Sequence, residues 1–263
     1  MDTLTLVFIV ISAFTALSWI LSLITGDTSQ VDRLWSIVPE LYIWILVIRD
    51  GFSNGLLLAM ALITTAWGAR LTFNFARKGG YSGEEDYRWE IVRKRMTPVQ
   101  FEIFNIFFIA IYQNFLLFII ALPAYYILEH SGKLNGPTWI CIILFIFALI
   151  GETTADQQQW NFHQAKKTGK TNKRFLDQGL FSISRHPNFF FEQSQWWLLY
   201  LIGGFSTNHL LNYSILGAIL LTLLFLGSTN LTENISLGKY PEYADYQKST
   251  SAIIPWIGLK KRK

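Results

Sequence analysis

A basic loop turns into an apolar helix at Gly179-Leu-Phe-Ser-Ile-Ser-Arg-His-Pro-Asn-Phe-Phe-Phe-Glu192. Pro187 suits the first turn of a helix, where its missing N–H would have no partner in any case. The free amides of that turn, together with Arg185, favour an anion such as a phosphate. Asn188 and Glu192 are four residues apart and share one helical face, so they present an amide and a carboxylate to the same partner.

The composition places this helix in a membrane. The chain of 263 residues is 51% hydrophobic and only 15% charged, with a mean hydropathy of +0.31, which is too apolar for an ordinary soluble domain. Seven apolar stretches are long enough to cross or nearly cross a bilayer of about 30 Å. We therefore expect an all-α bundle of seven transmembrane helices, over residues 4–24, 34–49, 55–76, 101–128, 137–160, 188–205 and 212–230.

The basic residues orient this bundle. With seven spans, 19 of the 22 lysine and arginine residues fall on one side, Arg49 and Lys133 fall on the other, and Arg70 lies inside the third span. The richer side is expected to be cytoplasmic, which places the N-terminus outside and the C-terminus inside. The first stretch is expected to be a retained span, because its apolar core is long and no basic region precedes it. We expect a multi-pass protein of the bacterial inner membrane whose chemistry faces the cytoplasm.

Several classes of protein are disfavoured. The basic loops are explained by topology and by contact with anionic lipid, so membrane lipid is an expected partner and nucleic acid is not. Cys141 is the single cysteine, so no internal disulfide can form. The four histidines lack metal-like spacing, so no metal site is expected. No linker divides the chain, and we expect one domain over residues 1–263 and a monomer.

Charged residues occur where a membrane makes them expensive. A charge near a bilayer centre costs about 2.5–3.5 kcal/mol on insertion scales, so such residues should be paired or functional. The residues concerned are Asp32, Glu40, Arg70, Glu152, Asp156 and Glu192. Most lie toward the cytoplasmic side, which indicates a polar cavity open to the cytoplasm. Glu152 and Asp156 share a face and repel, so we expect Arg70 or Arg174 to compensate them, unless they belong to a structural ion-pair network.

The nucleotide-binding and hydrolytic motifs of soluble enzymes do not occur. The chain has no Gly-x-Gly-x-x-Gly after a strand, no Walker lysine loop, no His-Glu-x-x-His and no Gly-x-Ser-x-Gly. Helices and loops would therefore have to hold a dinucleotide.

Other motifs give a positive signal. Gly179-Leu180-Phe181, the Asn188-x-x-x-Glu192 pair and Asp245-Tyr246-x-Lys248-Ser249 before Ala252-Ile253-Ile254-Pro255 resemble the steroid 5-alpha-reductase-like family of integral membrane reductases. Its bacterial-type branch is similar around Val31-Asp32-Arg33-Leu34-Trp35, Trp67-Gly68-Ala69-Arg70-Leu71 and Glu85-Asp86-Tyr87-Arg88-Trp89. The resemblance covers nearly the whole chain.

This resemblance implies seven transmembrane helices that enclose NADPH from the cytoplasmic side. Asn188 and Glu192 would bind the nicotinamide carboxamide, whose donors and acceptor complement an amide and a carboxylate. The further cofactor-binding residues that it implies are Arg70, Asn74, Arg88, Asp156, Arg174, Arg185, His186, Tyr243 and Tyr246.

The reaction implied by the resemblance is reduction of the Δ4 double bond of a 3-oxo-steroid or a similar apolar enone. NADPH supplies the hydride, while hydrogen-bond donors hold the carbonyl oxygen and a proton is delivered to the neighbouring carbon. Asp32 and Tyr87 are the expected catalytic residues, because Trp67 stands where animal members have a tyrosine. To donate a proton, Asp32 needs a pKa well above about 3.9. Alternatively, Asp32 pairs with Arg33 or caps the second span.

A different reading shares the Arg-His-Pro helix start. Membrane methyltransferases that use S-adenosylmethionine to modify isoprenylcysteine or phospholipid have a similar architecture. Asn188 with Glu192 favours a nicotinamide amide, and the basic loop before Pro187 favours a phosphorylated dinucleotide. A non-enzymatic lipid-binding protein would not need so many charges facing a cavity. An apolar tunnel between the first four spans would accept many flat, hydrophobic substrates.

Overall fold

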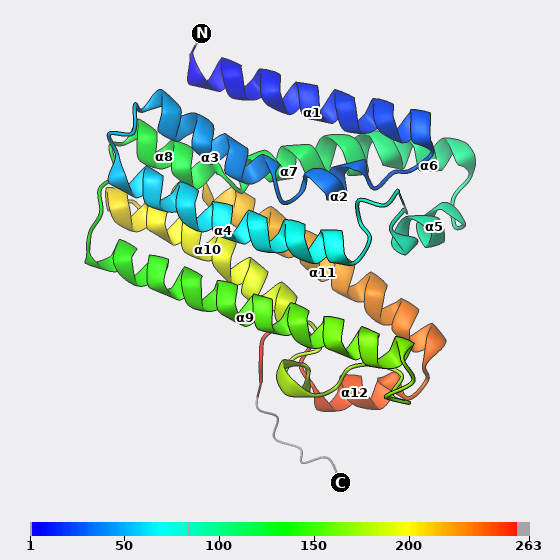
Figure 1. The fold of residues 1–263 in the computed structure, drawn as a ribbon. Coiled ribbons are helices and arrows are strands. Elements are labelled where there is room, and N and C mark those ends of the chain that lie inside the picture. Colours follow the sequence, from blue (N-terminus) through cyan, green and yellow to red (C-terminus); the bar gives the residue numbers. More distant parts are fainter. Residues whose placement is uncertain (1, 84, 257–263) are drawn as a thin grey trace. The chain divides into compact units, whose positions relative to one another are not determined.

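The computed structural model describes residues 2–83 and 85–256, and within them every regular element is helical and no strand occurs, which confirms the expected all-α class. The elements are α1 (Thr3–Thr25), α2 (Gln30–Leu34), α3 (Val38–Arg49), α4 (Gly55–Arg77), α5 (Tyr87–Arg93), α6 (Pro98–Phe104), the π-helix η1 (Asn105–Tyr112), α7 (Gln113–Ile119), α8 (Leu122–Glu129), α9 (Gly136–Lys167), the short 3-10 helix η2 (Gly179–Ser182), α10 (Pro187–Thr207), α11 (Ile215–Lys239) and α12 (Tyr243–Ser249) (Figure 1).

Five helices of the described chain are long and apolar enough to cross a membrane: Thr3–Thr25, Gly55–Arg77, Pro98–Ile119, Gly136–Lys167 and Ile215–Lys239. The expected spans over 34–49 and 188–205 fold as α3 and α10. At about 1.5 Å per residue the 12 residues of α3 reach only about 18 Å, less than a bilayer core. The polar first turns of α10 lower its hydropathy. Seven spans and the orientation of the termini stay predictions, and Lys260, Lys261, Arg262 and Lys263 lie outside the described residues.

The expected fourth span, 101–128, is interrupted. Pro98–Ile119 forms a continuous run of α6, η1 and α7, and the chain then turns at Ile120 and Ala121. A new helix, α8, begins at Leu122 with Pro123 in its first turn. Because proline has no N–H and clashes within a helix interior, it marks the start of a separate helix.

Two compact units make up the chain. The first comprises Met1–Ile142 with Leu199–Ala218, and the second comprises Ile143–Leu198 with Ile219–Lys263. In the first unit α3 packs along α4, and α1 packs against η1 and α7 (Figure 1). Its core includes the fully buried side chains of Tyr42, Leu57, Met60, Trp67 and Leu117. The single-domain expectation stays a prediction.

Two serine–asparagine hydrogen bonds hold α1 in the first unit. Asn114 donates through Nδ2 to Ser18 Oγ, and Asn105 donates through Nδ2 to Ser22 Oγ, each at 3.0 Å. In an α-helix, residues nine apart are about two and a half turns apart and face opposite sides. The π-helix begins at Asn105 and ends at Tyr112, two residues before Asn114, and its i→i+5 bonds make wider turns. This wider winding brings both asparagines to the side that faces α1.

In the second unit the loop that follows α9 folds onto α12 (Figure 1). The ring of Phe175 stacks on Tyr246 at 5.3 Å and meets Tyr243 edge-on at 5.1 Å between ring centroids. Beyond α12 the chain runs beside the residues that precede α10. The backbone N–H of Arg185 donates to Ser251 O at 2.8 Å, and that of Trp256 donates to Ile183 O at 2.9 Å. The C-terminal segment therefore braces the start of α10.

Candidate functional site

Two antiparallel helices of the second unit bring the predicted polar residues together. Gln195 of α10 donates through Nε2 to Glu152 Oε2 of α9 at 2.6 Å. Farther along α9, Gln158 Oε1 accepts from the backbone N–H of Leu180 at 2.9 Å, just before α10 begins. The segment from Leu180 to Gln195 therefore runs antiparallel to α9. Asp156 lies between these two contacts and so faces the region where α10 starts.

One face of α10 carries three polar side chains. Asn188, Glu192 and Gln195 follow each other at i, i+4 and i+7 and therefore share a side of the helix. The bond from Gln195 to Glu152 turns this side toward α9. Burial deepens along it: Asn188 is half-buried, Glu192 is 8% exposed and Gln195 is fully buried.

Buried carboxylates line both helices at this point. Glu152 is 2% exposed and Asp156 is 4% exposed on α9, and Glu192 is comparably buried on α10. Burying a carboxylate is unfavourable unless polar partners receive it. The structure thus brings the predicted residues Asp156, Asn188 and Glu192 onto two facing helices, and adds the amide of Gln195, which is absent from the predicted set.

The Gly179-Leu180-Phe181 motif binds the segment before α10 to α9 and to α12. Gly179 has φ +63°, a left-handed conformation that favours glycine. A Cβ at this position would lie 2.5 Å from Gln158 Oε1, so a larger residue would displace the amide that binds Leu180. The hydroxyl of Tyr246 donates to the backbone oxygen of Phe181. Tyr246 therefore joins α12 to the segment that leads into α10.

Arg185 anchors the helix start. Its Nε donates to Glu233 Oε1 at 2.6 Å, its Nη2 donates to Glu233 Oε2 at 2.9 Å, and its Nη1 donates to the backbone oxygens of Gln247 and Thr250. His186 Nε2 lies 3.2 Å from Glu233 Oε1. These contacts employ most of the donors of the guanidinium. Arg185 and His186 therefore fix α10 to α11 and to the C-terminal segment, and their contact with a cofactor stays a prediction.

Arg174 does not compensate the buried carboxylates. Its guanidinium pairs with Glu242, with Nε 3.1 Å from Oε1, at the surface where the loop meets α12. The expectation that Arg174 would neutralise Glu152 or Asp156 is wrong, because docking of Phe175 on α12 carries the loop to Glu242 instead. Tyr243 and Tyr246 are both buried at this junction, and burial raises the pKa of Tyr243 to about 12.

The predicted catalytic residues gather in the first unit, between α2 and α5. Trp89 donates through Nε1 to Asp32 Oδ2 at 3.2 Å. Burial raises the pKa of Asp32 to about 6, although the positive charge of Arg88 opposes this shift. Arg33 pairs with Asp27, with Nη2 2.5 Å from Oδ2, so the alternative in which it neutralises Asp32 is wrong. Tyr87 begins α5 with half of its surface exposed.

The remaining predicted residues of the first unit lie on α4 and α5. Arg88 binds Asp86 through Nε and Nη2, each at 2.9 Å. Arg70 and Asn74 share a face of α4 at i and i+4. The buried amide of Asn74 accepts from Arg77 Nε at 3.0 Å. Arg70, Asn74 and Arg88 belong to the first unit, whereas the other predicted cofactor residues belong to the second.

Glu40 is a candidate that the predicted set did not include. Its Oε2 is buried and accepts no hydrogen bond from any residue in the described part of the chain. A Cβ at Gly68 would lie 2.8 Å from that oxygen and 2.5 Å from Ser36 O, so only glycine fits there. Two features of the sequence point to this site: a carboxylate that follows Pro39 within an apolar stretch, and a glycine that directly follows Trp67, which is buried in the structure.

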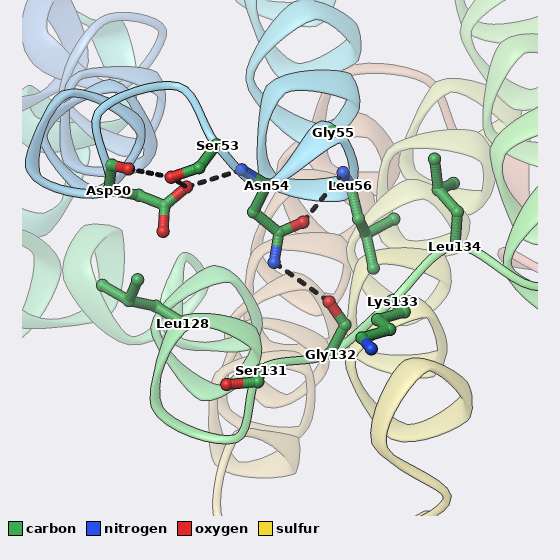
Figure 2. A pocket seen from close by; sticks show the side chains of 10 residues that line it. All are labelled: Asp50, Ser53, Asn54, Gly55, Leu56, Leu128, Ser131, Gly132, Lys133 and Leu134. Atoms are coloured by element: carbon green, nitrogen blue, oxygen red, sulfur yellow. Dashed lines mark hydrogen bonds between the residues drawn. The ribbon is translucent and has the colours of Figure 1, made fainter.

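Two cavities of the first unit lie apart from these residues. Figure 2 shows one of about 320 Å³ lined by Asp50, Ser53, Asn54 and Lys133 among others. Asp50 Oδ2 accepts from the N–H of Asn54 at 2.6 Å, and Asn54 Nδ2 donates to Gly132 O at 3.0 Å, so these groups satisfy one another within the turns. A second cavity, of about 440 Å³, is apolar and is lined by residues of α1, η1 and α7 that include Phe8, Trp19 and Phe115.

Comparison with known proteins finds a family whose model covers all the residues of the predicted site. A family model described as "Protein of unknown function (DUF1295)" matches residues 18–250, a span that contains every residue of the predicted site. An uncharacterized protein of Schizosaccharomyces pombe is 38% identical over 258 residues, which covers 90% of this chain and 75% of the relative. No solved structure matches the chain.

Proposed function

Because the chain belongs to the DUF1295 family, which is related to membrane steroid reductases and isoprenylcysteine methyltransferases, we propose that it is an NADPH-dependent membrane reductase. Its substrate would be a 3-oxo-Δ4-steroid or a similar apolar enone, reduced at the carbon–carbon double bond. The observation that carries this proposal is the buried polar face of α10, where Asn188 and Glu192 lie beside Gln195 and opposite α9.

The residues present fit a nicotinamide group. A carboxamide has a carbonyl acceptor and N–H donors, and the amide of Asn188 and the carboxylate of Glu192 offer the complementary groups. A bound NADPH would supply a hydride. The chain's own contribution is to hold the helix that presents these side chains, which Arg185 achieves through Glu233 and the C-terminal segment.

Asp32 is the carboxyl group that we propose as the proton donor. Reduction of an enone requires a donor at the carbonyl oxygen and a proton for the neighbouring carbon. Asp32 is held by Trp89 and has a pKa raised to about 6, so a substantial fraction stays protonated in mildly acidic solution. Glu40 is a second candidate because its buried Oε2 has no donor among the described residues. Tyr87 begins α5, the helix whose Trp89 donates to Asp32.

The basic loop before α10 supports a phosphorylated cofactor. Lys173 pairs with Asp177 and Arg174 pairs with Glu242, whereas Lys167 and Lys170 are exposed and form no ion pair within the described chain. Their charges are therefore available to a 2′-phosphate. We accordingly propose that NADPH is preferred to NADH, and that the cofactor enters from the cytoplasmic side.

The purified protein in detergent or nanodiscs can be tested with NADPH and progesterone. Loss of nicotinamide absorbance in step with formation of the saturated ketone is the expected result. No binding of NADPH, together with transfer of a methyl group from S-adenosylmethionine to an isoprenylcysteine or a phospholipid, would instead establish the methyltransferase reading, which the shared Arg-His-Pro helix start and the family relationship favour.

A further inference from the structure

Gln195 carries an acceptor that nothing in the described chain satisfies. The residue is 0% exposed, and its Oε1 accepts no hydrogen bond from any described residue. Its Nε2 is fully engaged, because it donates to Glu152 Oε2 at 2.6 Å and to the backbone oxygen of Phe191 at 3.2 Å. An amide nitrogen has two N–H groups, so both are used.

Chemistry fixes the orientation of this amide. The atoms that face Nε2 are a carboxylate oxygen and a backbone carbonyl oxygen, and both are acceptors. Turning the amide over would place Oε1 against two acceptors and lose both bonds. Oε1 therefore points away from them. A buried acceptor without a donor is unfavourable, so a donor that arrives with a ligand would stabilise it.

The amide also lies close to the predicted carboxamide site. Its bond to Phe191 O shows that the side chain runs back by one turn, toward the level of Glu192. Asn188, Glu192 and Gln195 share the side of α10 that faces α9. Gln195 is the most deeply buried of the three.

A carboxamide offers a donor that suits the unsatisfied acceptor of Gln195. A carboxamide has two N–H donors and one carbonyl acceptor. Asn188 provides an N–H for the carbonyl, and the carboxylate of Glu192 accepts one of the two N–H groups. The second N–H also needs an acceptor, and Gln195 Oε1 is a buried acceptor that receives no hydrogen bond from the described residues. We propose that Oε1 of Gln195 accepts it, so that three residues of α10 form hydrogen bonds with the carboxamide. This inference deepens the proposed function and rests on it.

The test uses two cofactors that differ only at this group. Dissociation constants for NADPH and for its 3-acetylpyridine analogue, which keeps the carbonyl and lacks the N–H donors, are measured by calorimetric titration of the full-length protein. Methionine at position 195 keeps the length of the side chain but offers no strong acceptor. Gln195→Met should raise the dissociation constant of NADPH about tenfold and that of the analogue by less than about twofold.

Gln193 provides the matched control. It is also a buried glutamine of α10, with 8% of its surface exposed, but a two-residue offset places it on another side of the helix. Gln193→Met should leave both dissociation constants within about twofold of those of the unmodified protein. If Gln195→Met does not fold, Gln195→Leu offers the same loss of the acceptor.

The outcomes separate the two proposals. If the unmodified protein binds NADPH and the variant weakens both cofactors equally, Gln195 acts through packing and the inference is wrong. Unchanged affinity for NADPH in the variant also overturns it, while the proposed function stands. If the unmodified protein binds neither cofactor, the proposed function itself fails and the inference fails with it.

Discussion

Arg185 and Glu233 form a two-pronged ion pair, with Nε 2.6 Å from Oε1 and Nη2 2.9 Å from Oε2, although the residues are 48 positions apart in the chain. Both side chains are nearly buried, with 9% and 11% of their surfaces exposed. Gln247 adds a third donor, from Nε2 to Glu233 Oε2 at 2.8 Å. The pair therefore joins the start of α10 to α11 and to α12.

Breaking this pair should destabilise the protein strongly. Removal of one partner of a buried ion pair leaves an uncompensated charge and costs about 3–5 kcal/mol. Glu233→Gln should therefore lower the midpoint of thermal unfolding and expose the C-terminal segment to limited proteolysis. Glu242→Gln removes the exposed partner of Arg174, worth about 0–1 kcal/mol, and is the control. Equal shifts for both variants would contradict the anchoring role.

The polar face of α10 can be tested directly by cofactor binding. Glu192→Gln and Asn188→Ala should each raise the dissociation constant of NADPH at least about tenfold, because each removes a hydrogen bond to a buried polar group. Circular dichroism should show the helix content unchanged. Asn234→Ala, at an exposed position of α11, is the control. Undiminished binding of NADPH to Glu192→Gln would refute the assignment.

The raised pKa of Asp32 predicts a pH dependence. The protonated carboxyl is the donor, and it predominates below a pKa of about 6. Above that pH the neutral fraction falls about tenfold for each unit, so kcat/KM should decline along a limb with a midpoint near 6. Asp32→Asn should abolish this limb and lower turnover more than it changes cofactor affinity. A profile that keeps the same limb in Asp32→Asn would assign the titration to another group.

Glu40 can be separated from Asp32 by paired variants. Glu40→Gln keeps the shape of the side chain and removes its acidity, so turnover should fall by an order of magnitude or more if it supplies the proton. Affinity for NADPH should not change. Gly68→Ala should mimic this loss, because the added Cβ would meet both Glu40 Oε2 and Ser36 O. Full turnover in Glu40→Gln would leave Asp32 as the donor.

The contact of α1 can be measured by a double-mutant cycle. Ser22→Ala, Asn105→Ala and the double variant remove one hydrogen bond of 3.0 Å between α1 and η1. Polar bonds between membrane helices average about 0.6 kcal/mol and reach about 1.7 kcal/mol. We expect a coupling energy in this range from unfolding in mixed micelles. Additive effects would show that the bond does not hold α1.

Local periodicity predicted much of the second unit. Asn188 and Glu192 fall on one face because four residues make about one turn, and the structure places that face against α9. The start of α10 at Pro187 follows from the fixed φ of proline and its missing N–H. These features depend on residues close together in sequence, so a sequence pattern can carry them.

Long-range partners could not be predicted in this way. Glu233 lies beyond the expected end of the last apolar stretch at residue 230, and nothing local points it to Arg185. Arg174 likewise meets Glu242 because aromatic packing places the loop on α12. Hydropathy also cannot distinguish an α-helix from a π-helix, because the two differ in winding and not in composition.

The segment Asn105–Tyr112 has a consequence for engineering and for natural length variation. A π-helix has more residues in each turn than an α-helix, so this segment contains more residues than an α-helix of the same length would. Deletion of one residue would tighten the coil without breaking it. The same deletion would rotate Asn105 around the helix axis, away from Ser22, and would remove one of the two serine–asparagine hydrogen bonds that hold α1.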